Sequence, residues 1–242
     1  MTIWLSPPNP DFERYSLKTL FSNASVMWTE AEIIHRENLV RAIPHMLLSA
    51  WQSLNPAVRM VRVETPILTP AAQLQSHIEV GFDLLGPVGK DGARGYLRPE
   101  TTAGTFAALN AMYPQAENRV KQCPLCVWQV GLSFRDEAKG ETMRASKLRL
   151  IQFYQMEFQL FLRRGSKADY LGAATDALVR RFGGNIVVAD ELPHYSERTL
   201  DWHIADLEVA GCSFRKDWPD GDLVEIAIGL DRLVAFQMSE SF

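Results

Sequence analysis

The chain has 242 residues, of which 47% are hydrophobic and 22% are charged, a balance that excludes a disordered protein and suits a folded domain with a core of normal size. The formal net charge of −4 excludes an overall positive field for holding nucleic acid, so any RNA contact has to be local or has to use another chain. With no apolar run of membrane-spanning length, no secretory signal and an odd count of 3 cysteines, the chain is expected to be a cytoplasmic protein without a membrane segment.

The first predicted element is a long helix over residues 28–54. Thr29 is suited to cap it, Glu30 and Glu32 favour the positive end of its first turn, and apolar residues recur downstream at helical spacing. Pro44 is expected to kink or interrupt this helix. Residues 1–27, which precede the helix, are interpreted as an N-terminal extension.

The middle of the chain contains a predicted hairpin. A strand over residues 58–66 comes first, followed by a loop-rich stretch over 69–95 and a short helix over 101–112. Strands over 127–134 and 148–162 are then predicted to pair antiparallel around a long polar tip.

The C-terminal part is predicted to hold an amphipathic helix, three strands and a final helix, over residues 167–182, 185–189, 206–214, 223–228 and 230–238. Strands that follow one another in hairpins and are flanked by helices predict an α+β fold around an antiparallel sheet. Because the chain has no long flexible linker, we expect one domain over residues 1–242.

The segment Phe134-Arg135-Asp136-Glu137 stands at the end of a predicted strand and opens the polar tip. An arginine fixed at a strand end is able to fork onto a phosphate or a carboxylate. An acid beside it is able to orient that arginine or to accept a hydrogen bond from an adenine amino group. Taken alone, such a tetrapeptide is more often a solvated charged turn.

A second segment, residues 225–233, runs from a strand through Gly229 into the start of a helix. The glycine lets a ligand approach the backbone, and the helix N-terminus supplies free N–H groups for an anion. Arg232, in the first turn, is able to cover an adenine ring or reach a γ-phosphate. The alternative interpretation is an ordinary strand-to-helix turn with an exposed arginine.

Two further segments place acids where a ligand or a structural partner is needed. Glu100 follows Pro99 at a predicted helix start, where it either favours the helix end or receives the ammonium group of an amino acid. Glu157 shares a strand face with Phe153 and Gln155, and a carboxylate there requires a cation, either from a substrate or from a local arginine. The ring of Phe153 offers a stacking platform for a base.

Together these segments resemble class II aminoacyl-tRNA synthetases. Residues 134–137 resemble motif 2 of that class, and residues 229–232 resemble motif 3. Residues 63–66 resemble motif 1, which in that class follows a long helix and forms a dimer interface around the proline. Within the class the chain is most similar to glycyl-tRNA synthetase of the homodimeric type, through residues 96–104, 129–137, 155–157, 194–196 and 208–215.

The resemblance implies an ATP-dependent ligase that joins a small amino acid, with glycine the first candidate, to AMP, and that works as a homodimer with ATP and Mg²⁺. It implies two catalytic residues: Arg135, which holds the α-phosphate and the substrate carboxylate, and Arg232, which covers the adenine and touches the γ-phosphate. The other implied ATP-binding positions are Asp136, Glu137, Arg149, Phe153, Glu208 and Gly229. Glu100, Glu157 and Glu225 are implied to surround the substrate ammonium, and Glu208 to bind magnesium.

The sequence also departs from the family pattern. Ile151-Gln152 stand where the family has Arg-Glu before the stacking Phe, and Arg149 is the expected substitute for that contact. Ile226-Ala227 replace the family's Pro-Ser, so specificity for glycine stays open. Because the chain ends at Phe242, soon after motif 3, no anticodon-binding domain is expected in it.

Three functions therefore compete. The chain is a reduced ligase that charges tRNA, a paralogue that delivers the same adenylate to a carrier protein, peptide or small molecule, or a non-catalytic accessory protein on the same fold. The acidic balance and the missing anticodon domain favour the second over the first. The retained arginines favour activation chemistry over the accessory function.

Two further features are assigned structural roles. Cys123-Pro124-Leu125-Cys126 has zinc-knuckle spacing, but no second ligand pair stands beside it, so a zinc site is not expected. His194 is expected to be a hydrogen-bonded loop residue rather than a catalytic base.

Overall fold

The computed structural model describes residues 28–88, 95–136, 150–166, 168–205 and 207–239. Its centre is a seven-stranded sheet in the order β1-β5-β6-β10-β9-β8-β7. Every neighbouring pair in it is antiparallel except β1 and β5, which are parallel, so the predicted α+β fold around an antiparallel sheet is confirmed. The strands are β1 (Arg59–Arg62), β5 (Leu125–Phe134), β6 (Gln152–Leu162), β7 (Asn185–Val188), β8 (Ser196–Ile204), β9 (Leu207–Arg215) and β10 (Asp222–Gly229).

Helix α1 (Glu30–Leu54) begins at a capping box in which the Thr29 hydroxyl accepts from the Glu32 N–H and the Glu32 carboxylate accepts from the Thr29 N–H. The helix continues through Pro44, so the predicted interruption is wrong. Pro44 is buried, and the neighbouring Ile43 and Leu47 lie in the core, so we attribute the intact helix to packing that outweighs the lost hydrogen bond.

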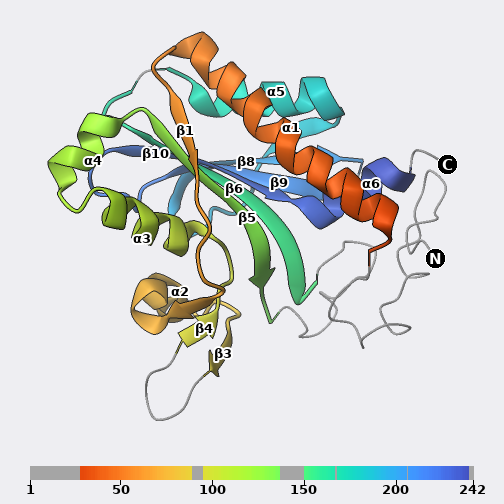
Figure 1. Ribbon diagram of the computed structural model, residues 1–242, viewed down its shortest axis with the longest axis horizontal. Coiled ribbons are helices and arrows are strands. Elements are labelled where there is room, and N and C mark those ends of the chain that lie inside the picture. Colours follow the sequence, from red (N-terminus) through yellow and green to blue (C-terminus); the bar gives the residue numbers. More distant parts are fainter. Residues whose placement is uncertain (1–27, 89–94, 137–149, 167, 206, 240–242) are drawn as a thin grey trace.

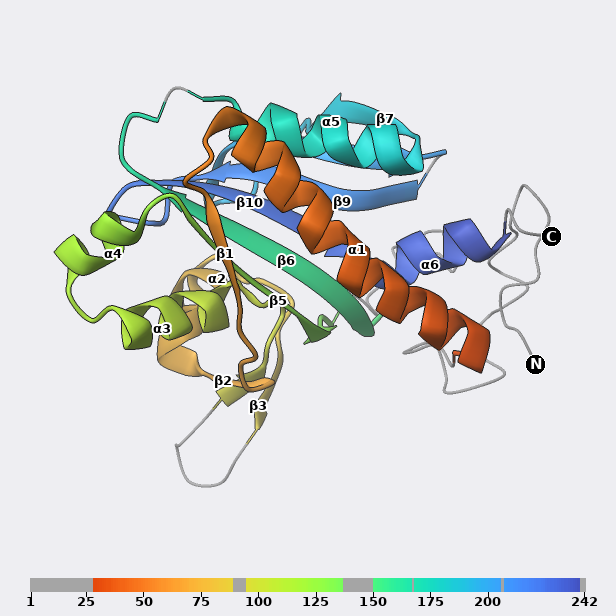
Figure 2. The same cartoon turned by 45° about the horizontal axis from the view of Figure 1, so that its top comes forward.

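Helices α1, α5 (Tyr170–Phe182) and α6 (Leu230–Ser239) cover one face of the large sheet (Figures 1 and 2). The strands alternate, so the even-numbered residues Met156, Phe158 and Leu160 of β6 join the core beneath these helices. Trp51 of α1 is fully buried there, and its indole N–H donates to the carbonyl of Tyr170 at 2.9 Å. This layer fixes which strand residues face the opposite side.

The opposite face is only partly covered. Helices α3 (Thr102–Met112) and α4 (Ala116–Gln122) lie on that side (Figure 2), and α3 contacts β5 and β6. A second, smaller core forms there around Leu109, Phe161 and Leu223. The rest of this face, where Glu157 and Glu225 project, forms the floor of a cleft.

The described part of the stretch predicted to be loop-rich, residues 69–88 and 95, instead takes part in a small module. It contains a three-stranded sheet in the order β2-β4-β3, with β2 (Leu68–Pro70), β4 (Gly95–Leu97) and β3 (Leu85–Val88), and the helices η3 (Ala71–Leu74) and α2 (Gln75–Glu79). Strands of three or four residues carry too little alternation to be recognised from sequence. Strand β8 and helix α4 were also missed, whereas β1 is shorter than the predicted strand over 58–66.

Candidate active site

A cleft of about 610 Å³ opens on the face of the large sheet opposite α1 and α5. It is lined from the small module by Phe82, from the connection before α3 by Glu100, from β5 by the adjoining Arg135, and from α6 by Arg232. The sequence-predicted residues that line it are Glu100, Arg135, Phe153, Glu157, Glu208, Glu225, Gly229 and Arg232. Segments more than a hundred residues apart in the chain therefore face a single space.

The floor of the cleft consists of cross-strand rows. One row places Glu157, Ala227, Gly211 and Asp201 on neighbouring strands, and the next places Gln159, Glu225, Ser213 and Thr199. Because the middle of the first row is an alanine and a glycine, the floor is flat between the carboxylates at its two ends. A third row contains the pair Gln155 and Gly229, which lies toward the N-terminus of α6.

At the acidic end, the start of α3 donates to Glu157, which is 1% exposed. Its Oε2 accepts from the backbone N–H of Thr101 at 2.9 Å and from the hydroxyl of Thr101 at 2.6 Å. The hydroxyl of Thr102 lies 2.7 Å from Glu225 Oε2. The first turn of α3 therefore holds two carboxylates of neighbouring strands in place.

Arg215 of β9 supplies the positive charge behind these carboxylates. Its Nη1 lies 2.7 Å from Glu225 Oε2, and its Nη2 lies 2.6 Å from Asp217 Oδ2. The ring of Tyr195 packs on the guanidinium, with 3.7 Å from Cζ to the ring centroid. Burial alone lowers the pKa of Arg215, but the charge of Glu225 and the hydrogen bonds that Arg215 donates to Asp217 raise it well above its usual value.

Glu100 and two histidines form a cluster with unsatisfied polar atoms. Glu100 Oε1 lies 3.5 Å from His77 Nε2 and 3.7 Å from Arg215 Nη1, both beyond ordinary hydrogen-bond length. Both ring nitrogens of His77, Nε2 of His194 and Oε1 of Glu100 are buried without a hydrogen-bond partner in the described part of the chain. His194, expected to be a hydrogen-bonded loop residue rather than a catalytic base, lines the cleft, and that expectation stays a prediction.

The pKa values of Glu157 and Glu100 are shifted in opposite directions. Burial, together with the charges of Glu225 and Glu100, raises the pKa of Glu157 to about 8. Burial also opposes ionisation of Glu100, but contact with His77 and the charge of Arg215 outweigh it and lower its pKa. Glu100, Glu157 and Glu225 thus place three carboxyl groups around the one guanidinium that contacts two of them, that of Arg215, among the residues the structure describes, and this arrangement suits a cationic ligand.

The cleft also carries arginine and aromatic side chains. Arg135 donates from Nε to the carbonyl of Pro99 at 3.0 Å, and its Cζ lies 5.4 Å from the ring centroid of Phe82 and 5.3 Å from that of Phe153. Arg232 donates from Nη1 to the backbone carbonyl of Glu208 at 2.7 Å. Two different elements therefore place a guanidinium group in the same cleft.

Glu208 and Asp201 stand near Arg232 on neighbouring strands, and both line the cleft. Glu208 Oε1 is 3.9 Å from Arg232 Nη1. Burial, and next the charge of Glu208, raise the pKa of Asp201. Within the described ranges, no group of three or more His, Cys, Asp or Glu is arranged to hold a metal ion by itself.

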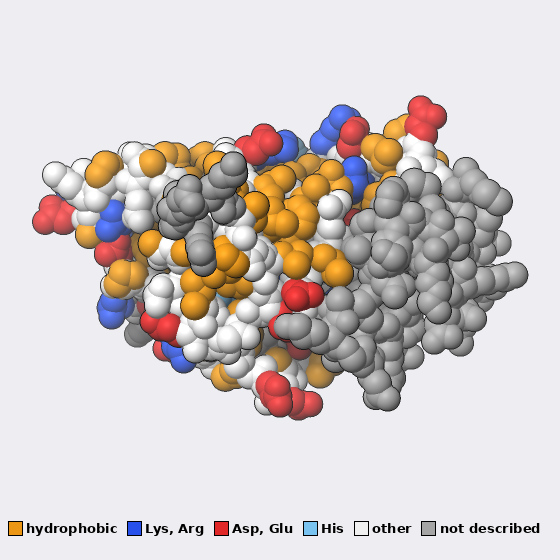
Figure 3. All heavy atoms as spheres, turned by 90° about the horizontal axis from the view of Figure 1, so that it is seen from below, with side chains coloured by type: hydrophobic (Ala, Val, Ile, Leu, Met, Phe, Trp, Pro, Cys, Tyr) orange, Lys and Arg blue, Asp and Glu red, His pale blue; other side chains and the backbone are white. Residues whose placement is uncertain are grey.

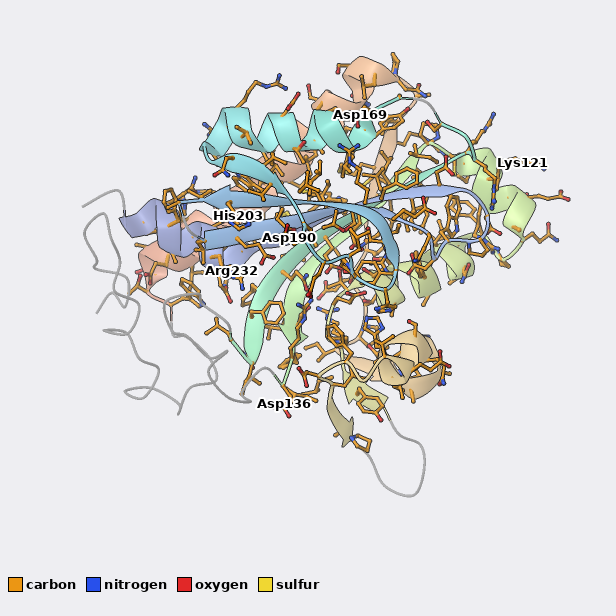
Figure 4. All side chains as sticks on the ribbon, turned by 180° about the vertical axis from the view of Figure 1, so that it is seen from behind. Lys121, Asp136, Asp169, Asp190, His203 and Arg232 are labelled. Carbon is orange, nitrogen blue, oxygen red and sulfur yellow. The ribbon has the colours of Figure 1, made fainter. Side chains whose placement is uncertain are left out.

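One predicted ATP-binding position within the described residues, Asp136, is not among those that line the cleft. Asp136 follows the end of β5, where its N–H donates to the carbonyl of Asp83 in the small module, and Figure 4 shows it well below Arg232. Glu137 and Arg149 lie outside the described residues. Cys123 and Cys126 are buried free thiols.

Sequence reasoning did not assign roles to several residues that build the site. Thr101 and Thr102 look like ordinary helix-start residues, and His77 stood in a stretch predicted to be loop. Arg215 was noted only as part of a resembling segment, and Asp201 had no distinguishing pattern. A signal existed for the threonines alone, because they directly follow Glu100.

The surface beneath the small module carries hydrophobic and acidic side chains, with the visible Lys and Arg scattered toward its rim (Figure 3). Ile67, Leu68 and Val88 are among the exposed hydrophobic residues of this module. Among the described residues, no helix is long and apolar enough to cross a membrane.

Solved structures share this architecture. A prolyl-tRNA synthetase of Giardia lamblia, in complex with prolyl-adenylate, superimposes on 92% of this chain and 49% of its own with a TM-score of 0.67 and 15% identity. A pyrrolysyl-tRNA synthetase of Desulfitobacterium hafniense covers 87% of this chain and 76% of its own with a TM-score of 0.53 and 17% identity. The chain has the catalytic-core fold of a class II aminoacyl-tRNA synthetase, as its motifs predicted.

Within that class, the similar sequences are glycine–tRNA ligases. The enzyme of Deinococcus radiodurans is 30% identical over 152 residues, which are 57% of this chain and 29% of the relative. That of Chlorobaculum tepidum is 28% identical over 124 residues, 51% of this chain and 25% of the relative. The chain thus matches 25% to 29% of the length of these relatives, and no family model matches it.

Proposed function

We propose that this chain activates a small amino acid, with glycine the first candidate, by joining its carboxylate to AMP from ATP. One observation carries the proposal. A single cleft is lined by the guanidinium groups of Arg135 and Arg232 and by the carboxyl groups of Glu100, Glu157 and Glu225. A nucleoside triphosphate and the ammonium group of an amino acid present charges complementary to these two sets of groups.

The two arginine residues and Phe153 suit the nucleotide. Arg135 is proposed to hold the α-phosphate and the substrate carboxylate, while Phe153 and Arg232 lie against the two faces of the adenine. A carboxylate oxygen of the amino acid attacks the α-phosphorus, the bond from that phosphorus to the oxygen bridging to the β-phosphate breaks, and pyrophosphate leaves. No proton has to move, so positioning and charge neutralisation suffice.

The acidic end suits the substrate ammonium. Glu157 and Glu225 are fixed by Thr101, Thr102 and Arg215 at distances of 2.6–2.9 Å, so they need little rearrangement to receive it. An ammonium group between them also relieves the like-charge repulsion that raises the pKa of Glu157. Ala227 and Gly211 are small, so the floor leaves room above them for a small amino acid.

The acids beside Arg232 fit a magnesium ion. Mg²⁺ is commonly held by one or two carboxylates together with substrate phosphates, and Glu208 and Asp201 supply such a pair facing the cleft. The ion, when bound with ATP, would neutralise phosphate charge. Glu208 is therefore assigned the metal-facing role, with Asp201 as its partner.

The acceptor proposed first is tRNA, because the similar sequences are those of glycine–tRNA ligases. The adenylate carbonyl carbon would be attacked by a terminal ribose hydroxyl, which loses its proton as AMP leaves. A homodimer is also proposed, since α1 exposes Ile33 and Ile34 and the edge strand β1 exposes Val61. Light scattering that finds a monomer at assay concentrations would contradict the dimer.

The test is amino-acid-dependent exchange of labelled pyrophosphate into ATP, run separately with each amino acid. Exchange is expected with glycine or another small amino acid, and it should be lost in Arg135→Ala. The control is Arg181→Ala, which removes an exposed arginine at the end of α5 and should retain exchange. Absence of exchange with every amino acid would instead support the accessory function.

If exchange occurs, adding tRNA separates the acceptors. An acid-precipitable, base-labile aminoacyl product with tRNA supports the charging function. Exchange without such a product supports delivery to a different acceptor.

A further inference from the structure

Asp231 is a buried acid whose position links two walls of the cleft. It lies in the first turn of α6, directly before Arg232, and is 3% exposed. Its Oδ2 accepts the backbone N–H of Tyr154 at 2.9 Å, and Tyr154 directly follows Phe153 on β6. One hydrogen bond therefore connects the segment that carries Phe153 to the segment that carries Arg232.

This bond lies where the sheet ladder ends. The pairing of β10 with β6 runs as far as Gly229 opposite Gln155, and α6 begins at the next residue, Leu230. From there the backbone of α6 follows the helix instead of continuing alongside β6. The carboxylate of Asp231 takes the Tyr154 N–H, so it continues the connection between the two segments for one further residue.

Arg36 of α1 packs against the contact between Asp231 and Tyr154. Its Cζ lies 3.8 Å from the centroid of the Tyr154 ring, so it covers the residue that Asp231 holds. The second oxygen of Asp231 and Nη1 of Arg36 are each buried without a hydrogen-bond partner in the described structure. Burial raises the pKa of Asp231 to about 7, although the Tyr154 N–H and the charges of Arg36 and Arg232 oppose this rise. Asp231 is thus largely shielded from solvent, although it and Tyr154 form part of the cleft wall.

We propose that Asp231 is a positioning residue for the nucleotide, which fixes the spacing between Phe153 and Arg232 by holding the Tyr154 N–H. The inference rests on the proposed function, in which those two side chains lie on opposite faces of the adenine. The amino-acid end is held by different contacts, from Thr101, Thr102 and Arg215. Loss of Asp231 therefore weakens ATP binding and leaves amino-acid binding intact.

The test uses the full chain and compares Asp231→Ala with Asp231→Asn in pyrophosphate exchange. Removing an acceptor from a buried N–H typically changes an equilibrium about tenfold, so D231A should raise the KM for ATP about tenfold and change the KM for the amino acid by less than about twofold. D231N retains an oxygen acceptor for Tyr154 and should keep the KM for ATP within about threefold of the wild type.

The matched control is Asp222→Ala. Asp222 also accepts backbone N–H groups, from Gly165 at 2.7 Å and Ser166 at 3.0 Å, but at the opposite end of β10. D222A removes a comparable contact away from the cleft and should leave both KM values unchanged. If D231A does not fold, D231S replaces it in the test. The serine side chain is shorter than the aspartate side chain, so it does not reach the Tyr154 N–H.

A second measurement separates this inference from the proposed function. The rise in Tm that ATP produces is recorded for each variant, and it requires no turnover. If the wild type exchanges no pyrophosphate, the proposed function fails, while an ATP-induced rise that D231A loses and D231N retains still supports positioning by Asp231. Equal rises of both KM values in D231A, a D231N variant as impaired as D231A, or no effect of ATP on the wild type would each overturn the inference.

Discussion

Replacing Glu157 by glutamine tests the electrostatics of the acidic end directly. Glu157 is 1% exposed, and its Oε2 accepts two hydrogen bonds from Thr101. Burial and the neighbouring charges of Glu225 and Glu100 raise its pKa to about 8. Glutamine has the same size and keeps an oxygen acceptor for Thr101, but it cannot titrate.

The magnitude follows from proton linkage. The folded chain keeps the Glu157 proton up to a pH of about 8, whereas the unfolded chain loses it near the ordinary value of 4.5. The folded state then binds more protons in this window, so the free energy of unfolding falls as pH rises. The fall is about 1.4 kcal/mol per pH unit, which amounts to about 3 kcal/mol between about pH 5.5 and about pH 7.5.

The assay is urea unfolding of the wild type and E157Q at several pH values, followed by tryptophan fluorescence. The difference between the two proteins cancels the contributions of the other titrating groups, including Asp231. We expect E157Q to gain stability relative to the wild type steadily as pH rises from about 5.5 to about 7.5. Parallel curves for the two proteins would show that Glu157 ionises normally in the fold, and the account of this end of the cleft would be wrong.

Three further outcomes are expected. Arg215→Met leaves the buried Glu225 and the more exposed Asp217 without their guanidinium partner and should lower the free energy of unfolding by about 3–5 kcal/mol, chiefly through Glu225, measured by urea unfolding; a loss below about 1 kcal/mol would contradict the ion pairing. Gly211→Val should fold normally, because an added Cβ meets one neighbour at 3.9 Å, yet it should lower pyrophosphate exchange at least about tenfold by filling the floor, and unchanged exchange would place the substrate elsewhere. Amino-acid binding at about pH 7 should release close to one proton from Glu157, detected by calorimetry in buffers of different ionisation enthalpy, and heats that do not depend on the buffer would refute this.

The sequence was sufficient for features that have strong local signals. The long helix, the hairpin of β5 and β6 and the turn from β10 into α6 all follow from periodicity and from Gly229. Strand β8 was missed because its sequence, SERTLDWHI, carries charged residues in a strand that lies between β7 and β9. Its position depends on pairing with distant strands, which no local pattern reports.

The same limit applies to the site. The acids and arginines were recognised singly, and their convergence on one cleft was inferred from their resemblance to known motifs. The contact of Arg215 with Glu225 depends on the register that sets Glu225 opposite Ser213 in β9, so it is visible only once the strands are paired. His77 reaches Glu100 from the small module, whose short strands gave no sequence signal.

The alternation along β10 has a consequence for folding errors. Ile226 lies in the core under the helices, while its neighbour Glu225 faces the cleft. A slip of one residue in the pairing of β10 would send the carboxylate into the apolar layer and the isoleucine into the substrate space. Such a misfolded chain would bury an unpaired charge, so the residues that serve the chemistry also discriminate against the wrong strand register.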